Sequence, residues 1–331
     1  MAANPSRDAA ANPGTQCAVV IVGVGRSGTS AITRGVQALG VELGDRLRPP
    51  GAKNPTGFFE DQPLLSINKR LKRLLRIRGD SVRLIEPAEW QAPAVQALQQ
   101  EAIETVRRGF GRYPLWGYKY ARTLRLLPFW RPVFEALRLD VRYVVALRNP
   151  LSVARSRAAL DPQRGTQEQS DLEWLVNVVP YFRDLRQHAF VVADFDSVLA
   201  HPAEQLERIG TLLGLPKTAD TQAAIRAYES EFLRPGMRHT VFTDRDLRQD
   251  GRVNPLTRDA YESLRRLATD ECSVNDRQFW QHWESIEQQL AAMAPVLHHV
   301  DRIQNALRRA QWNPVGPIQA AWFAWRRWRR G

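Results

Sequence analysis

The residues best suited to chemistry lie in a glycine-rich loop near the start of the chain. A continuous apolar run, CAVVIVGV at 17–24, leads into the segment GVGRSGTS at 23–30, and a helical pattern follows to about residue 39. Glycines let backbone N–H groups turn inward, and the first amides of the helix add unpaired donors and the positive end of its dipole. A strand, a glycine-rich loop and a helix in this order predict a phosphate-binding loop.

This loop departs from the nucleoside-triphosphatase pattern GxxxxGK[ST] at one position. Gly23, Gly28 and Ser30 fit the pattern, but Thr29 stands where it has Lys. That Lys normally reaches the β- and γ-phosphates, so the loop lacks the main charge for triphosphate hydrolysis, while Arg26 supplies a cation from inside it. The loop therefore suits a shorter anion at a 5′ position. An ordinary glycine-rich turn between a strand and a helix is the alternative.

A second phosphate-binding segment is predicted later in the chain. The apolar run 141–148 ends in Arg148, Asn149 and Pro150, and Ser156 follows eight residues after Arg148. Ligands of open α/β sheets bind at the carboxyl ends of parallel strands, and proline suits the first turn of a helix. An arginine at the strand end and a hydroxyl two turns along the helix form a natural phosphate clamp. A surface salt bridge is the alternative role for Arg148.

Both segments need a parallel sheet to bring them together. Besides 17–24, strands are predicted at 114–120, 141–148 and 189–195, and helical patterns lie between them at 63–77, 93–108, 129–138, 151–159, 169–187 and 201–213. Buried strands that alternate with helices predict an α/β fold with a central parallel sheet flanked by helices. We expect a disordered leader at 1–16, an α/β domain at 17–240, a helical extension at 241–310 and a Trp/Arg-rich tail at 311–331.

The composition excludes several classes of protein. The 331 residues carry a net charge of +12, which indicates an anionic partner, although 42 of the 47 basic residues are Arg and genome base composition explains part of that excess. Two cysteines build neither a disulfide framework nor a zinc site. The chain shows no signal peptide and no apolar run of membrane-spanning length, so a cytoplasmic location is expected.

The motifs together resemble those of sulfotransferases that use 3′-phosphoadenosine 5′-phosphosulfate (PAPS). The loop residues Arg26–Ser30 look like the family's 5′-phosphosulfate loop, and Asn54–Asp61 (NPTGFFED) is similar to the NP-x-G-[FYW]-[FW]-E segment of prokaryotic members. The segment 117–122 (GYKYAR) resembles G-x-K-[DE]-P-R, with Tyr and Ala at the acidic and proline positions. Arg148 and Ser156 match the family's 3′-phosphate segment. The resemblance covers about residues 17–240, and it implies the P-loop-type sulfotransferase fold.

The resemblance also implies which residues bind the nucleotide. The expected ligands of its phosphates are Arg26, Ser27, Gly28, Thr29, Ser30, Arg148, Ser156 and Arg234. Arg234 lies in a segment, 228–239, that falls where the family has a loop over the nucleotide, and it aligns with the family in two alternative ways.

The implied reaction is in-line transfer of a sulfuryl group to an acceptor hydroxyl, with no metal required. Arg26 is expected to stabilise charge on the bridging oxygen of the leaving phosphate. All six His residues lie at or beyond position 188, so the expected general base is a carboxylate, Glu60 first and Asp61 second. Asp61 is also the better candidate for capping the helix that starts near Pro63. Lys119 either contacts the sulfonate or an acidic acceptor, or lies at the sheet rim.

Two basic amphipathic segments remain. Residues 64–78 place Lys and Arg opposite an apolar face made by positions 64, 67, 71, 74 and 75, which indicates either a solvated face or a guide for an anionic or lipid-linked acceptor.

In the tail, Trp322, Trp325 and Trp328 repeat every three residues, with arginines mostly opposite. This pattern is typical of an interfacial membrane helix, and we expect 316–331 to bind a membrane surface, making the protein peripheral at the inner face. Packing of the tryptophans on the domain is the alternative.

The sequence therefore predicts a PAPS-dependent sulfotransferase with a carbohydrate, glycolipid or similar hydroxyl acceptor. The alternatives are a P-loop kinase or NTPase, disfavoured by the missing loop Lys, and a non-catalytic basic membrane-associated binding protein. Nucleic acid is not an expected partner, because the core of the chain shows no helix-turn-helix and no interleaved aromatic and basic motif.

Overall fold

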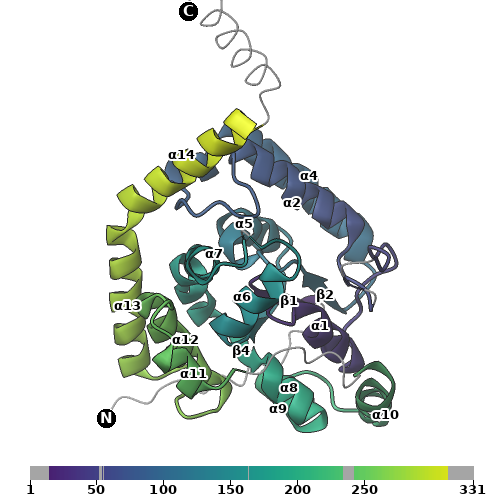
Figure 1. Ribbon diagram of the computed structural model, residues 1–331. Helices are drawn as coiled ribbons and strands as arrows, with labels where there is room; N and C mark the ends of the chain where they lie inside the picture. The colour runs from purple at the N-terminus through teal and green to yellow at the C-terminus, as the bar shows by residue number, and fades with distance from the viewer. Residues whose placement is uncertain (1–14, 52–53, 55, 163, 234–241, 312–331) are drawn as a thin grey trace, which may run out of the picture.

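The computed structural model describes residues 15–51, 54, 56–162, 164–233 and 242–311. Within them, four strands form one parallel sheet in the order β2-β1-β3-β4. The strands are β1 (Cys17–Gly23), β2 (Leu115–Lys119), β3 (Asp140–Leu147) and β4 (Ala189–Asp194). In Figure 1 the strands lie at the centre with helices around them. The predicted α/β fold with a central parallel sheet is confirmed, and each predicted strand agrees with the observed one to within a residue at either end.

Helices connect and cover the strands. Their bounds are α1 Thr29–Ala38, α2 Gln62–Leu74, α3 Pro87–Trp90, α4 Pro93–Phe110, α5 Leu127–Ala136, α6 Pro150–Ala158, α7 Gln167–Phe182, α8 Phe195–Ala200, α9 Pro202–Leu212, α10 Ala219–Ala227, α11 Asp244–Gln249, α12 Pro255–Ala268, α13 Arg277–Ala292 and α14 Ala294–Gln311. No helix among these residues is long and apolar enough to cross a membrane.

Strand β1 is apolar on both faces because helices cover both. Side chains alternate along a strand, so Val19 and Ile21 pack in one core with α1, α9 and α10. Val20 and Val22 pack in a second, larger core that includes residues of α2, α4, α5 and α7. This double burial explains why β1 reads as an uninterrupted apolar run.

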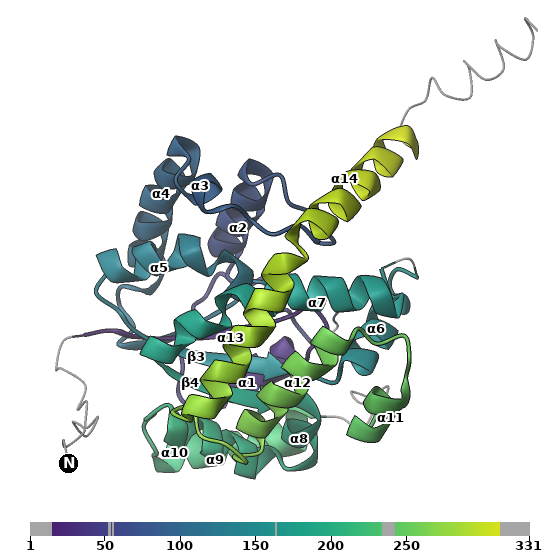
Figure 2. The ribbon, with the colours of Figure 1, turned by 90° about the vertical axis from the view of Figure 1, so that its left-hand side faces the viewer.

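The helical extension packs on the α/β domain. Tyr261 of α12 and Trp283 of α13 are buried in the larger core, where the Phe182 ring centroid lies 4.6 Å from that of Trp283. Helices α13 and α14 then follow one another along one side of the molecule (Figure 2). The extension is therefore held by aromatic packing that its charged sequence alone did not indicate.

The turn from β1 to α1 requires glycine at one position. Gly28 has φ = 79°, a left-handed conformation, and a Cβ atom there would lie 2.0 Å from the ring of Phe195. A methyl carbon cannot lie this close to a ring carbon unless the ring or the backbone moves. The missing side chain is thus what lets the start of α8 pack against the loop.

Replacing Gly28 by Ala is expected to destabilise the fold by about 3 kcal/mol, because the new methyl group overlaps Phe195 and the backbone stays left-handed. Urea unfolding measures the loss. The control is Gly251→Ala, since a Cβ at Gly251 meets nothing within 4 Å; it should change stability by less than about 1 kcal/mol. Equal stability of the two variants would show that the close approach at Gly28 is absent.

Candidate functional site

The carboxyl edge of the sheet gathers the predicted functional residues. The phosphate loop follows β1, Lys119 ends the adjacent strand β2, and Arg148 follows β3 on the other side. Parallel strands bring their carboxyl ends to one edge, so residues more than a hundred positions apart in sequence meet here. This edge is the usual ligand position of open α/β sheets.

Backbone conformation shapes the phosphate loop. Arg26 has φ = 80° and Gly28 has φ = 79°, so two left-handed residues stand close together in the loop. Alternation of this kind turns successive N–H groups toward one side and forms an anion-binding concavity. The Ser27 hydroxyl is buried and donates to the Val24 carbonyl at 2.7 Å, so it stabilises the loop from inside. Thr29 is buried at the start of α1.

The two predicted phosphate segments contact each other directly. The Arg26 Nε donates to Ser156 Oγ at 3.0 Å, across 130 positions of sequence. Arg148 Nη1 donates to the Arg26 carbonyl at 3.2 Å, which ties the end of β3 to the loop. Asn149 caps α6, with its side chain accepting from the Leu151 amide, so the helix that carries Ser156 starts at Pro150. The structure thus brings together Arg26, Arg148 and Ser156.

Phe195 supports Arg148, a role that sequence reasoning missed. The Arg148 guanidinium carbon lies 4.8 Å from the centroid of the Phe195 ring, within the range of a cation–π contact. The same ring lies against Gly28. Phe195 therefore packs between the loop and Arg148. In the sequence, the position of this phenylalanine directly after a buried strand was the one feature that could have indicated its role.

Lys119 ends the edge strand β2, and its side chain is buried. Its side chain is 4% exposed, and Nζ lies 3.1 Å from Glu60 Oε1 and 2.9 Å from the Phe58 carbonyl. Nζ also lies 3.4 Å from Ser30 Oγ, at the start of α1. Burial lowers the pKa of the Lys119 ammonium, and the charge of Glu60 opposes that shift. Lys119 thus lies at the end of an edge strand, and its ammonium is buried against Glu60.

Glu60 and Asp61 have different surroundings. The second oxygen of Glu60 lies 3.4 Å from Arg48 Nη1, so cations flank both oxygens of this carboxylate. Asp61 is the N-cap of α2 and accepts from the Leu64 amide at 3.0 Å, as expected for a cap. Burial raises the pKa of the Asp61 carboxyl, while the Leu64 amide and Arg46 oppose the shift. Asp61 thus has a structural role as the cap of α2, whereas Glu60 pairs with Lys119 in the candidate site.

The segment 54–61 is also joined to the phosphate loop. The Asn54 amide donates to Ser30 Oγ at 3.1 Å and to the carbonyl of Gly57. Ser30 therefore receives donors from both Asn54 and Lys119. The sequence resemblance covered Asn54, but Arg48 precedes the motif and no pattern indicated it.

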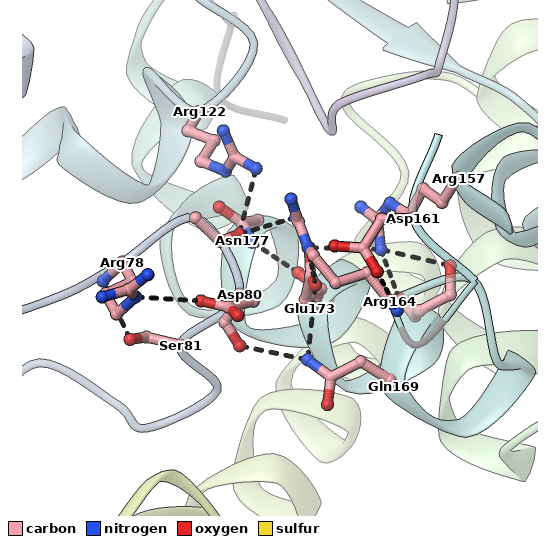
Figure 3. A network of polar contacts seen from close by, with 12 residues as sticks. Arg78, Asp80, Ser81, Arg122, Arg157, Asp161, Arg164, Gln169, Glu173 and Asn177 are labelled. Carbon is pink, nitrogen blue, oxygen red and sulfur yellow. Dashed lines mark hydrogen bonds and ion pairs between the residues drawn. The ribbon is translucent and has the colours of Figure 1, made fainter. Parts of the chain in front are cut away.

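A network of arginines holds the segment after α2 against α6 and α7 (Figure 3). Arg122 and Arg164 both donate to the Gly79 carbonyl at 3.0 Å. Glu173, whose side chain is fully buried, lies 2.7 Å from Arg164 and 3.4 Å from Arg157. A Cβ at Gly25 would lie 3.9 Å from Arg122 Nη2, so the network reaches the phosphate loop. Arg122 was part of the GYKYAR motif, but sequence analysis did not place it in the site.

Three predictions fall wholly or mostly outside what the structure describes. Arg234 and the rest of 234–241 lie outside the described residues, as do the Trp/Arg tail from 312 onward and residues 1–14 of the expected leader. Within the described ranges, no three His, Cys, Asp or Glu side chains are grouped to hold a metal ion.

Comparison with known proteins returns structural likeness only. No protein-family model and no curated protein sequence matches this chain. Among solved structures, the chain is similar to sulfotransferase STF9 from Mycobacterium avium, with 15% identity over 66% of this chain and 69% of that one, at a TM-score of 0.41. It is also similar to the sulfotransferase domain of the Synechococcus PCC 7002 olefin synthase, with 14% identity over 84% and 95% of the two chains, at a TM-score of 0.36. With TM-scores this low, neither structure assigns a function to this chain.

The Lys119–Glu60 pair is expected to be energetically coupled. Lys119→Met leaves the buried Glu60 with one cation, and Glu60→Gln leaves the ammonium without its carboxylate, so each should cost about 2–4 kcal/mol of stability. Their sum should exceed the cost of the double variant by about 1–3 kcal/mol in urea unfolding. Arg48→Gln removes the more exposed partner and should cost no more than about 1 kcal/mol. Strict additivity of the two buried substitutions would contradict the pair.

Proposed function

We propose that this protein transfers a sulfuryl group from 3′-phosphoadenosine 5′-phosphosulfate to an acceptor hydroxyl. The observation that carries the proposal is the contact of Arg26 with Ser156, together with that of Arg148 with the loop backbone. Two phosphate-binding segments that meet at one sheet edge suit a nucleotide with phosphates at two separate positions.

The loop would hold the 5′-phosphosulfate. The first N–H groups of α1 have no acceptor inside the helix, and they add to the dipole at its N-terminus. Arg26, Thr29 and Ser30 complete this end of the site. Left-handed backbone at a residue with a side chain is costly and persists where the fold enforces it, often at ligand sites; Arg26 is such a residue.

Arg148 and Ser156 would hold the 3′-phosphate. Arg148 is 6% exposed and its guanidinium is positioned by Phe195 and by the Arg26 carbonyl. A pre-positioned arginine loses little freedom when it binds a phosphate, which favours charge-assisted hydrogen bonds. A phosphate there would compete for Ser156 with Arg26, releasing the Arg26 side chain toward the 5′ side.

Glu60 is the proposed general base. In the transfer, the acceptor oxygen bonds to sulfur as the bond from sulfur to the bridging oxygen breaks, and Glu60 takes the acceptor proton. Lys119 and Arg48 hold the carboxylate in place, and Lys119 also contacts Ser30 at the loop. Arg26 is the proposed cation for the leaving phosphate. The acceptor we propose is a hydroxyl of a carbohydrate, a glycolipid or a similar molecule.

A P-loop kinase fits the site less well. Thr29 occupies the position of the phosphate-binding Lys, and Arg148 stands at the end of β3. The carboxylate that ends β4, Asp194, accepts from the Ser197 amide at 2.8 Å as the N-cap of α8 and lies 3.6 Å from Arg265. Its Oδ1 is thus engaged by the cap and by Arg265, which disfavours a magnesium-binding role.

Two adjacent carboxylates give a direct test of the proposal. With labelled PAPS and a panel of sugar, glycolipid and phenolic acceptors, Glu60→Gln should lower kcat by about 10²–10⁴-fold with little change in the KM for PAPS. Asp61→Asn is the matched control; asparagine caps a helix as well as aspartate does, so this variant should change stability by less than about 1 kcal/mol and keep the turnover. Full turnover in Glu60→Gln, or an equal loss in both variants, would exclude Glu60 as the base. No transfer by the wild-type chain to any acceptor would count against the proposed activity.

A further inference from the structure

Exposed apolar side chains are concentrated on α14. Among the described residues, the large apolar side chains that are exposed are Leu74, Leu160, Leu212, Val296, Ile303 and Leu307. Three of these six belong to α14, where Val296 is 60%, Ile303 45% and Leu307 58% exposed. They are spaced by seven and four residues, which places them on one stripe of the helix. Val300, half-buried, lies between them on the same stripe.

An adjacent face of α14, turned by about 100° from the stripe, is anchored to the domain. Leu297 is fully buried in the larger core, and Asp301 accepts from the Val82 amide at 3.0 Å. Gln304 donates to Gln169 at 2.6 Å, and Arg308 forms an ion pair with Asp80. These contacts fix the rotation of the helix, so the apolar stripe points outward in the folded chain.

Basic side chains lie on and near α14. Arg302 and Arg309 are exposed on α14 itself, on a face turned by more than 100° from the stripe. The contacts at Asp80 and Val82 place α14 beside the segment that directly follows α2. From residue 69 to residue 78 the exposed side chains are Lys69, Arg70, Arg73, Leu74, Arg76 and Arg78. Of these, Arg70 forms an ion pair with Glu101, and Arg78 lies 3.8 Å from Asp80. Leu74, predicted to lie on the buried face of α2, is 43% exposed and adds apolar area.

We propose that this docking surface, formed by the α14 stripe (Val296, Ile303 and Leu307) and the exposed residues of 69–78, binds an anionic lipid bilayer. Apolar side chains flanked by Arg and Lys are suited to the boundary between lipid headgroups and acyl chains. Each basic residue near an anionic leaflet adds attraction. The segment that follows Gln311 in the sequence carries Trp322, Trp325 and Trp328 with four arginines, which continues the same chemistry.

Charge favours a bilayer over a second copy of the chain. Two copies joined through this surface would bring Arg302, Arg309 and the basic side chains of 69–78 against one another. Like charges facing each other across an interface disfavour association. An anionic bilayer instead complements the surface, and this inference does not depend on the proposed enzymatic activity.

Vesicle sedimentation of the full chain tests the proposal. Wild-type protein should pellet with vesicles of phosphatidylcholine and phosphatidylglycerol and much less with pure phosphatidylcholine. Ile303→Asp/Leu307→Asp should weaken binding to the anionic vesicles by about tenfold or more, because two inserted apolar side chains become charged. Both positions are exposed, so thermal unfolding should be close to that of the wild type.

The matched control is Leu160→Asp/Leu212→Asp, which makes the same two changes at 46% and 50% exposed positions outside α14. It should sediment like the wild type. Three results would overturn the proposal: no binding of the wild type to anionic vesicles, equal weakening in both double variants, or unchanged binding in Ile303→Asp/Leu307→Asp. Light scattering without vesicles tests whether a second copy of the chain covers this surface instead. If the wild type is a dimer and Ile303→Asp/Leu307→Asp is a monomer, the surface is a self-association interface and the proposal is overturned.

Discussion

The site depends on the absence of a side chain at Gly28. Because no Cβ is present there, the Phe195 ring packs directly on the phosphate loop, and Arg148 lies over the same ring. The turn after β1, the start of α8 after β4 and the residue after β3 are thus joined by one close contact. A methyl group at this position would separate the three segments whose proximity forms the candidate nucleotide site.

Several charged side chains of this protein are buried and paired with the opposite charge. Lys119 and Glu60 form a buried pair beside the loop, with the more exposed Arg48 next to it, and Arg157 and Arg164 share the buried Glu173. Such pairs compensate one another and contribute little to the field outside. Exposed basic side chains of 69–78 and of α14 lie apart from the candidate nucleotide site at the sheet edge.

Much of the architecture could be predicted, because the parallel strands are continuous apolar runs and the loop motif stands between a strand and a helix. The capping role of Asp61 was also readable, since Pro63 sits in the first turn of α2. Phe195, Arg48 and the placement of Arg122 were not, because their roles arise from contacts between segments distant in sequence. The burial of Lys119 and the exposure of Leu74 likewise depend on which neighbouring segments cover them. Helical periodicity gives the face of a residue but not what packs against it.

The central claim is that the phosphate loop and the Arg148–Ser156 segment form one site for a nucleotide with 5′- and 3′-phosphates. Calorimetric titration with adenosine 3′,5′-bisphosphate and with adenosine 5′-monophosphate tests it most directly, because the ligands differ only in the 3′-phosphate. Charge-assisted hydrogen bonds predict at least about tenfold tighter binding of the bisphosphate, with most of that difference lost in Arg148→Gln and kept in the exposed control Arg131→Gln. Equal affinity for the two ligands, or tighter binding of ATP with magnesium, would contradict the claim.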